Sequence, residues 1–513
     1  MAGLELLLGV DVGTTGCKAA AFDLEGNLAG GGSAEYPTRY IPGNGVEQNP
    51  EAWWTAVCDS IGSALASVNR SSQVRAVSVS SQAPTLLPVD GNGKPIRPAL
   101  IWMDRRAGRE TRNLEEKFGF EEVLRRTGNR PDPYFVAAKL RWFSRTEPGN
   151  AARTRWFLQI NGFINHRLTS NFTLDRAHAG LLQLYDPVGA DWWTELIEWC
   201  GFSPELFPTP SDGSEIIGTV TDSAAAATGL EPGTPVVAGT VDGAAAALEA
   251  GVIDPGTAAE MTGTSTVLIM PTDRALPNPA FICMPHALPG RVLSLAAMVS
   301  TGACLKWFRD ELGETERNRA ERERTDAYDL LTAIAAESPP GSNRIVFLPY
   351  MMGERSPHWH TDARGVYAGL SLASSKGDLL RAILEGTAFA LRENTEIARV
   401  SGLSIDRIRS VGGGAQSHLW NQIKADILGV PIEIPNASGG APFGDAVLAG
   451  IGCGALNNAE AFIRETVQIH RTFLPDKRLA GGYTERFQQF QRLYRSLKNQ
   501  FDDAAALGAF PTS

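Results

Sequence analysis

The chain has 513 residues, of which 43% are hydrophobic and 20% are charged, and its formal net charge is −10 at pH 7. This length exceeds what one hydrophobic core usually supports, so two domains are expected. The negative charge argues against nucleic acid or an anionic membrane surface as a partner. No stretch has the uncharged length of a membrane span, and six scattered cysteines without a Cys-x-x-Cys pair are typical of reduced thiols. We therefore expect a soluble, cytoplasmic protein.

The first distinctive segment is an apolar strand, a Gly/Thr turn and a second apolar strand within residues 6–23. Glycines let backbone N–H groups approach an anion closely, and threonines add hydroxyl donors. A carboxylate at the strand end is suited to hold a divalent cation through its waters. The segment fits either a phosphate site or an ordinary hairpin with a solvated turn. The candidate residues are Asp11 for the metal and Gly13, Thr14, Thr15 and Lys18 for the phosphates.

The same pattern recurs near the middle of the chain. Residues 256–270 repeat the strand, turn and strand, with Gly263, Thr264 and Ser265 in the turn but no counterpart of Asp11. Two such hairpins, each opening one half, suggest duplicated domains that face each other across a cleft and bind a polyphosphate from both sides. We expect these domains to cover residues 1–249 and 250–513.

An aspartate, Asp242, follows a buried strand at residues 235–241 and begins a helix rich in glycine and alanine. A carboxylate at this place is either a helix cap, which contributes about 1 kcal/mol, or a group directed into a cleft. The small residues that follow leave space beside it, which favours the cleft.

A run of glycines follows the strand at residues 408–411 and precedes a helix at 419–428. Such a turn suits the flat base and ribose of a nucleotide, because no side chain blocks the approach of the backbone. Another small-residue turn, at residues 300–303, opens an earlier helix. The nucleotide-binding candidates from these two turns are Gly302, Gly413, Gly414, Ala415 and Gln416.

Several residues of the first half are candidates for binding a small polyol. Trp102 and Asp104 stand at the exit of a strand, where a ring face and a carboxylate could hold hydroxyl groups, or where they form a core tryptophan and a surface ion pair. Gln82 and Ala83 lie in a polar loop after the strand at residues 74–80, a usual place for binding groups. Tyr134 follows a rigid bend and is either a binding or a packing aromatic.

In this order, from residue 6 to about 450, these motifs resemble the FGGY family of carbohydrate kinases, and in character they are nearest to the xylulokinases. Residues 365–370 and 378–385 are similar to the C-terminal signature of the family, with its spacing. The resemblance implies an α/β fold of two ribonuclease-H-like domains, as in the actin and hexokinase superfamily, around a central cleft. ATP, Mg²⁺ and a sugar would bind there, and the cleft would close on binding.

The resemblance also implies roles for the candidate residues. Asp242 resembles the general base, Asp11 the residue that organises magnesium, and Trp102 and Tyr134 the aromatics of the sugar site. The expected reaction is ATP-dependent phosphorylation of a terminal hydroxyl, with a pentulose such as xylulose as the favoured substrate. A polyol kinase of the glycerol or erythritol type and an actin-like ATPase module are the alternatives. A homodimer is compatible with the family.

Two departures from the family pattern bear on the substrate. Residues 82–84 read Gln-Ala-Pro, where xylulokinases typically show Gln-Met-His and glycerol kinases Gln-Arg-Glu. Gly243 follows the catalytic aspartate, where those families have Asn or Gln. Hydrogen-bond donors expected for either substrate are therefore missing, and a site without a partner for a substrate hydroxyl should bind it poorly.

Overall fold

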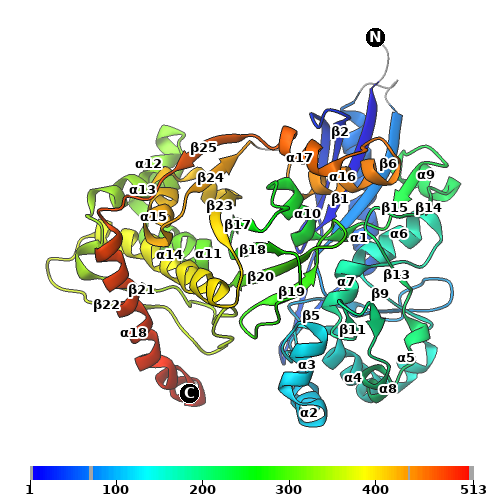
Figure 1. The fold of residues 1–513 in the computed structure, drawn as a ribbon, viewed down its shortest axis with the longest axis horizontal. Coiled ribbons are helices and arrows are strands. Elements are labelled where there is room, and N and C mark those ends of the chain that lie inside the picture. Colours follow the sequence, from blue (N-terminus) through cyan, green and yellow to red (C-terminus); the bar gives the residue numbers. More distant parts are fainter. Residues whose placement is uncertain (1–3, 69–72, 437–438, 508–513) are drawn as a thin grey trace.

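The N-terminal half of the chain is organised around a mixed sheet (Figure 1). The structure, a computed structural model, describes residues 4–68, 73–436 and 439–507. In spatial order, the strands of this sheet are β14 (Ile216–Thr219), β15 (Pro235–Val237), β6 (Gln73–Ser81), β1 (Glu5–Val12), β2 (Gly16–Asp23) and β3 (Leu28–Glu35), and β16 (Thr240–Val241) also pairs with β6. β1 runs antiparallel to β2 and parallel to β6. Its apolar residues are buried because helices cover both faces of the sheet, which explains why the strand is apolar along its length.

The C-terminal half is organised around a second mixed sheet. Its strands in spatial order are β19 (Ile282–Pro285), β20 (Val292–Met298), β18 (Thr266–Thr272), β17 (Gly256–Thr262), β23 (Ile405–Val411), β24 (Ile432–Pro435) and β25 (Ile469–Phe473). Its main helices are α11 (Thr301–Leu312), α12 (Glu314–Glu323), α13 (Ala327–Glu337), α14 (Lys376–Val400), α15 (His418–Leu428) and α18 (Ala480–Ala506). β17 pairs antiparallel with β18 and parallel with β23, as β1 does with β2 and β6.

The two halves therefore share one topology. In each, an antiparallel meander (β1, β2 and β3, or β17, β18 and β20) is extended on one side by parallel strands (β6 and β15, or β23 and β24). The turns at residues 13–15 and 263–265 occupy matching places in the two meanders. The expected duplication into two related α/β halves is confirmed.

Smaller elements complete the N-terminal half and its connections. The helices are α1 (Pro50–Ala66), α2 (Gly108–Phe118), α3 (Phe120–Thr127), α4 (Val136–Thr146), α5 (Pro148–Arg153), α6 (Ile160–Thr169), α7 (Arg176–Leu181), α8 (Thr194–Cys200) and α9 (Asp222–Thr228). The short strands, paired within small sheets, are β4 (Arg39–Ile41), β5 (Gly45–Gln48), β7 (Leu87–Val89), β8 (Ala99–Leu100), β9 (Trp156–Leu158), β10 (Leu174–Asp175), β11 (Tyr185–Asp186), β12 (Asp191–Trp192) and β13 (Pro210–Ser211). In the C-terminal half, β21 (Val346–Leu348) and β22 (Val366–Ala368) form a separate two-stranded sheet. Within the described residues no helix is long and apolar enough for a membrane crossing, and all six cysteines are unpaired.

Two helices cross where the halves meet (Figure 1). α10 (Asp242–Glu249) continues from β16, whereas α16 (Ala441–Gly452) comes from the C-terminal half and packs on β1 and β6 of the N-terminal sheet. After α16 the chain passes through α17 (Ala459–Thr466) and returns to the C-terminal sheet as β25. The domain boundary expected at residues 249–250 falls between α10 and β17. α16 lies beyond this boundary in the sequence but packs on the N-terminal sheet, so the division of the chain at this point stays a prediction.

Glycines allow this crossing. A Cβ atom at Gly444 would lie 2.1 Å from the carbonyl oxygen of Ala245 in α10, and one at Gly9 would lie 1.8 Å from the carbonyl oxygen of Pro442. Both distances are far below van der Waals contact and involve backbone atoms. The two helices and β1 therefore approach one another as closely as they do only because side chains are absent at these positions.

We predict that Gly444→Ala destabilises the protein by about 2–3 kcal/mol or more, because the added methyl group must displace backbone in a packed core. The matched control is Gly62→Ala in α1, where a Cβ atom would meet nothing within 4 Å. That variant should be neutral or stabilising by about 0.5–1 kcal/mol through helix propensity. Denaturant unfolding of the two variants measures the contrast, and equal stabilities would contradict a tight crossing.

Candidate active site

The turn at residues 13–15 is held by hydrogen bonds from its first N–H group and to two of its carbonyl groups. The Gly13 N–H donates to the Gly16 carbonyl over 3.0 Å, the Tyr36 hydroxyl donates to the Gly13 carbonyl, and the Gln48 side-chain amide donates to the Thr14 carbonyl over 2.8 Å. Within the described residues, the N–H groups of Thr14 and Thr15 donate to no acceptor. Two unpaired backbone donors on a rigid turn are the arrangement that binds an anion.

The turn at residues 263–265 repeats this geometry. The Gly263 N–H donates to the Ser265 carbonyl over 2.9 Å, and the Ala303 N–H donates to the Thr264 carbonyl over 2.9 Å. A Cβ atom at Gly302 would lie 1.9 Å from the Gly263 carbonyl oxygen. Gly302 is therefore required for the first turn of α11 to pack against this turn.

A buried polar network supports the second turn from beneath. Glu260, 1% exposed, accepts from both Lys424 (2.9 Å to each oxygen) and the Ser410 hydroxyl (2.5 Å). Its carboxylate also accepts from the Thr262 hydroxyl, which continues through Thr266 to Thr301 in two hydrogen bonds of 2.6 Å. A buried charge pair with all partners satisfied is a rigid base for the strand ends that carry the turn.

A cavity of about 330 Å³ opens beside the second turn. It brings together candidates from three distant segments, since Gly263, Thr264, Gly302, Gly413, Gly414 and Gln416 all line it. Sequence reasoning missed the rest of its wall, which consists of Thr262, Ala303, Leu305, Lys306, Asp326, Tyr328, Asp329, Thr332, Ser417 and Trp420. Flat glycine backbone on one side and an aromatic and aliphatic wall on the other suit a nucleoside.

Asp326 shows why this wall was missed. The dense mixed charge of residues 311–326 favours a solvated helical face. In the structure, Asp326 instead caps α13 by accepting from the Tyr328 N–H over 2.8 Å, and both residues line the cavity. The pattern of a cap before an apolar helix is visible in the sequence. Its place beside the glycine turn is not, because the two segments are far apart in the chain.

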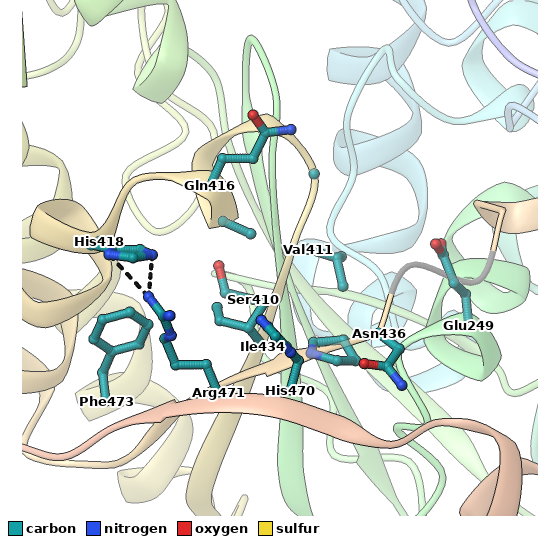
Figure 2. A pocket seen from close by; sticks show the side chains of 13 residues that line it. Glu249, Ser410, Val411, Gln416, His418, Ile434, Asn436, His470, Arg471 and Phe473 are labelled. Carbon is teal, nitrogen blue, oxygen red and sulfur yellow. Dashed lines mark hydrogen bonds between the residues drawn. The ribbon is translucent and has the colours of Figure 1, made fainter. Parts of the chain in front are cut away.

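A second cavity, of about 340 Å³, lies near the same glycine loop (Figure 2). Gln416 lines both cavities, whereas Ala415 lines only the second, beside His418 and Arg471. Arg471 donates to Nδ1 of His418 over 3.0 Å, and both side chains line this cavity. Ala415 is thus placed on a different cavity from the phosphate turns, and Ser265 lines neither cavity.

The candidate sugar residues are linked to the first phosphate turn. The Trp102 indole N–H donates to the Thr14 hydroxyl over 3.1 Å, and the Tyr134 hydroxyl donates to the Ala83 carbonyl over 2.8 Å, with 6.2 Å between the two ring centres. The Gln82 amide donates over 2.8 Å to Gln48, the residue that holds the Thr14 carbonyl. The structure thus brings Gln82, Ala83, Trp102 and Tyr134 together beside residues 13–15.

Asp104 has a different environment from the one expected. Its carboxylate is 0% exposed, accepts from the Val46 N–H over 2.7 Å, and forms an ion pair of 2.7 Å with Arg106. A carboxylate enclosed in this way has no surface with which to touch a substrate. The structure therefore does not support a direct substrate contact, and the ion pair belongs to the buried framework instead of the surface.

Two carboxylates face the same region from β1 and α10. Asp242 is the first residue of α10, and its carboxylate accepts from the Gly243 N–H over 2.7 Å. Burial and then the charge of Asp11 raise the pKa of Asp242 to about 7. Burial raises the pKa of Asp11 to about 6, although the Ser80 hydroxyl donates to it over 3.2 Å. Lys18 lies opposite Asp11 in the β1–β2 register, and its side chain is exposed.

The comparison with known proteins identifies the family. The model of the N-terminal domain of the FGGY family of carbohydrate kinases matches residues 6–249, and that of the C-terminal domain matches residues 258–453. The chain belongs to the FGGY family of carbohydrate kinases. It is therefore a sugar kinase, a phosphotransferase that uses ATP as a substrate.

Similar proteins cover almost the whole chain. Xylulose kinase of Escherichia coli (strain K12) is 30% identical over 497 residues, which is 96% of this chain and 99% of that protein. Gluconokinase of Bacillus subtilis (strain 168) is 28% identical, over 97% of each chain. The crystal structure of xylulose kinase from Rhodospirillum rubrum is 29% identical and superposes with a TM-score of 0.89 over 97% of this chain and 100% of that chain. The two-domain α/β fold predicted for an FGGY kinase is confirmed.

We predict that Glu260→Gln lowers the free energy of unfolding by about 3–5 kcal/mol, because Lys424 is left charged and buried without its partner. Replacing both residues by methionine should restore most of this loss. The exposed pair Arg319–Glu323, also 2.9 Å apart, is the control, and Glu323→Gln should cost less than about 1 kcal/mol. Chemical denaturation of the variants measures these differences; a small loss in Glu260→Gln would contradict the supporting role of the pair.

Proposed function

We propose that this kinase transfers the γ-phosphoryl group of ATP to a terminal hydroxyl of a pentulose, with xylulose as the first candidate. One observation carries the proposal: β1 and β16 both pair with β6 at Ser81, one on each side, so Asp242 begins α10 close to the first phosphate turn and to the loop after β6. Asp11, beside the first phosphate turn, raises the pKa of Asp242, and Asp242 in turn is among the charges that raise the pKa of Tyr134 on the sugar side. A base at this place lies between a triphosphate and a sugar.

Asp242 is the proposed general base. A carboxylate with a pKa near 7 is deprotonated in about half of the molecules at neutral pH and still has enough basicity to take a proton from an attacking hydroxyl. Its hydrogen bond from the Gly243 N–H holds one oxygen, which leaves the other for the substrate. Within the described residues the N–H groups of Thr264 and Ser265, like those of Thr14 and Thr15, donate to no acceptor. These four N–H groups are the proposed donors to the phosphoryl oxygens.

Asp11 fits a hard divalent cation such as Mg²⁺. Its carboxylate is partly exposed, has Ser80 as its side-chain donor, and carries a raised pKa, so its negative charge is poorly compensated. Oxygen ligands of this kind are those that Mg²⁺ prefers. When bound, the ion would neutralise charge on the phosphates and lower the pKa of the nearby carboxylates.

The relatives support the choice of sugar. The similar protein of Escherichia coli and the similar solved structure are named xylulose kinases, and the Bacillus subtilis relative is named a gluconokinase. Coupled ADP-release assays on xylulose, ribulose, gluconate, glycerol and erythritol test the proposal. We expect the highest kcat/KM with xylulose. The highest value with gluconate or a polyol would replace xylulose as the substrate, and sugar-independent hydrolysis in all reactions would indicate an ATPase module.

We predict that Asp242→Asn lowers kcat by about 10²–10⁴-fold, the usual contribution of a positioned base. The amide keeps the shape of the side chain, so the dissociation constants of ATP and sugar, measured by calorimetry, should change little. Near-normal turnover in this variant would remove Asp242 from the base role.

The pH profile gives a second test of the same residue. Asp242 acts as a base only when it is deprotonated, so kcat/KM for the sugar should fall roughly tenfold per pH unit below its pKa, which is about 7 before a metal ion binds. In the metal-free protein Asp11→Asn removes a charge that raises this pKa, so the pKa of Asp242, followed by NMR titration, should move to lower pH. An unmoved pKa would show that the two carboxylates do not interact.

A further inference from the structure

A loop of the C-terminal half, residues 349–365 between β21 and β22, reaches the sugar side of the site. It is anchored within its own half: the Ser356 N–H donates to Ala297 of β20 over 3.1 Å, and the Ser356 hydroxyl and the Trp359 indole donate to Ala280 over 2.7 and 3.2 Å. The loop is therefore a fixed part of that half, and its position follows the second sheet.

The Glu354 side chain fixes the backbone immediately before Arg355. One of its carboxylate oxygens accepts from the Val299 N–H and from the Arg355 N–H, each over 2.8 Å. Burial raises the pKa of Glu354 to about 8. The Glu354 carboxylate therefore connects the backbone N–H of Arg355 to that of Val299, the residue after β20.

The Arg355 guanidinium crosses from the C-terminal half to the N-terminal half. Its central carbon lies 5.1 Å from the ring centre of Trp102, the residue that donates to Thr14. The charge of Arg355 also acts on Tyr134, whose pKa it lowers against the larger effect of burial. The guanidinium is thus placed against both aromatics of the sugar side.

The N-terminal half has few donors left for a sugar. The indole N–H of Trp102, the hydroxyl of Tyr134 and the amide of Gln82 donate to Thr14, Ala83 and Gln48, respectively. Ala83 and Gly243 have no side-chain donor. Two further cations nearby are also engaged, since Arg105 pairs with Asp132 over 2.6 Å and the Lys139 amine donates to the carbonyls of Ile101 and Tyr134 over 2.8 and 2.9 Å.

Arg355 differs from these groups. Within the described residues its side chain forms no ion pair and donates no hydrogen bond, although a guanidinium has five N–H donors. Burial lowers the pKa of Arg355 by more than the charges of Tyr134, Glu354 and Asp132 raise it. A partly buried, unpaired guanidinium over a tryptophan is a ready donor for oxygen atoms of a ligand.

We propose that Arg355 is the main hydrogen-bond donor to the sugar and orients it for attack, so that the sugar site is completed only when the C-terminal half contacts the N-terminal half. This inference rests on the proposed function. Arg355, from the C-terminal half, would supply the hydrogen-bond donor to the sugar that Ala83 and Gly243 of the N-terminal half lack. The substrate accepts from Arg355 through its carbonyl or hydroxyl oxygens, and Trp102 supports the guanidinium from below.

The test compares Arg355→Gln, Arg355→Lys and the control Arg364→Gln. Arg364 stands in the same loop but donates to the carbonyls of Thr361 and Ala363, and it is exposed. For Arg355→Gln we expect the dissociation constant and the KM of the sugar to rise by about 10–100-fold, the usual loss for hydrogen bonds from a charged donor. The KM of ATP and the melting temperature should stay near those of the wild type. Lysine should restore part of the affinity, and the control should change sugar binding less than twofold.

Two results would overturn the proposal: a sugar affinity in Arg355→Gln equal to that of the wild type, or a parallel loss of sugar affinity, ATP affinity and melting temperature, which would show a structural role. Failure of the proposed function is recognised separately, in the wild-type protein. If gluconate or a polyol proves to be the substrate, the same binding comparison is made with that compound, and Arg355 is expected to show the same loss.

Discussion

The contact between Gly9 of β1 and the carbonyl of Pro442 at the start of α16 sets the position of the parts around it. Because no side chain separates the strand from the helix, α16 lies deep against the N-terminal sheet. Asp445 of this helix is thereby buried beside β6, where it accepts from the Ser78 and Ser80 hydroxyls over 3.3 and 2.6 Å. The single proton of the Ser80 hydroxyl is shared with Asp11, whose carboxylate oxygen lies 3.2 Å away. A packing contact between the halves thus continues, through one serine, to the carboxylate proposed to organise the metal ion.

The two halves contain the same turn, but within the described residues the carboxylates beneath it lack an ion-pair partner in the first half and have one in the second. Beneath the first turn, Asp11, Asp242 and Asp445 have raised pKa values because burial disfavours their charged forms, and the charge of Asp11 further raises the pKa of Asp242 and of Asp445. Beneath the second turn, Glu260 is neutralised by Lys424. Uncompensated charge is concentrated on the side where a cation and a proton transfer are proposed, and the other half offers a neutral, rigid support. Clusters of perturbed carboxylates are typical of functional sites, whereas a satisfied pair is typical of a framework.

Local patterns predicted the parts of the structure that are local. The two hairpins, the glycine loop and the helix that begins at Asp242 were predicted because turn chemistry and alternation of apolar residues depend on neighbours in the chain. Asp104 was a candidate sugar ligand because a strand exit looks the same in the sequence whether its carboxylate faces solvent or an arginine. The support from Lys424 to Glu260 and the wall from residues 326–332 could not be predicted, since these contacts join segments that only the folded chain brings together. Arg355 belongs to the same class, because its partner, Trp102, lies in the other half.

The insertion of α16 into the N-terminal sheet has a consequence for biosynthesis. The ribosome completes β1, β2 and β6 by residue 81, yet the helix that covers their face ends at residue 452. Until then, apolar strand residues such as Leu7 and Ala76, fully enclosed in the finished protein, have no native cover. Nascent chains that expose such surface are prone to aggregate and are typical clients of chaperones. The first strands can therefore complete their native packing only after α16, in the last fifth of the chain, has been synthesised.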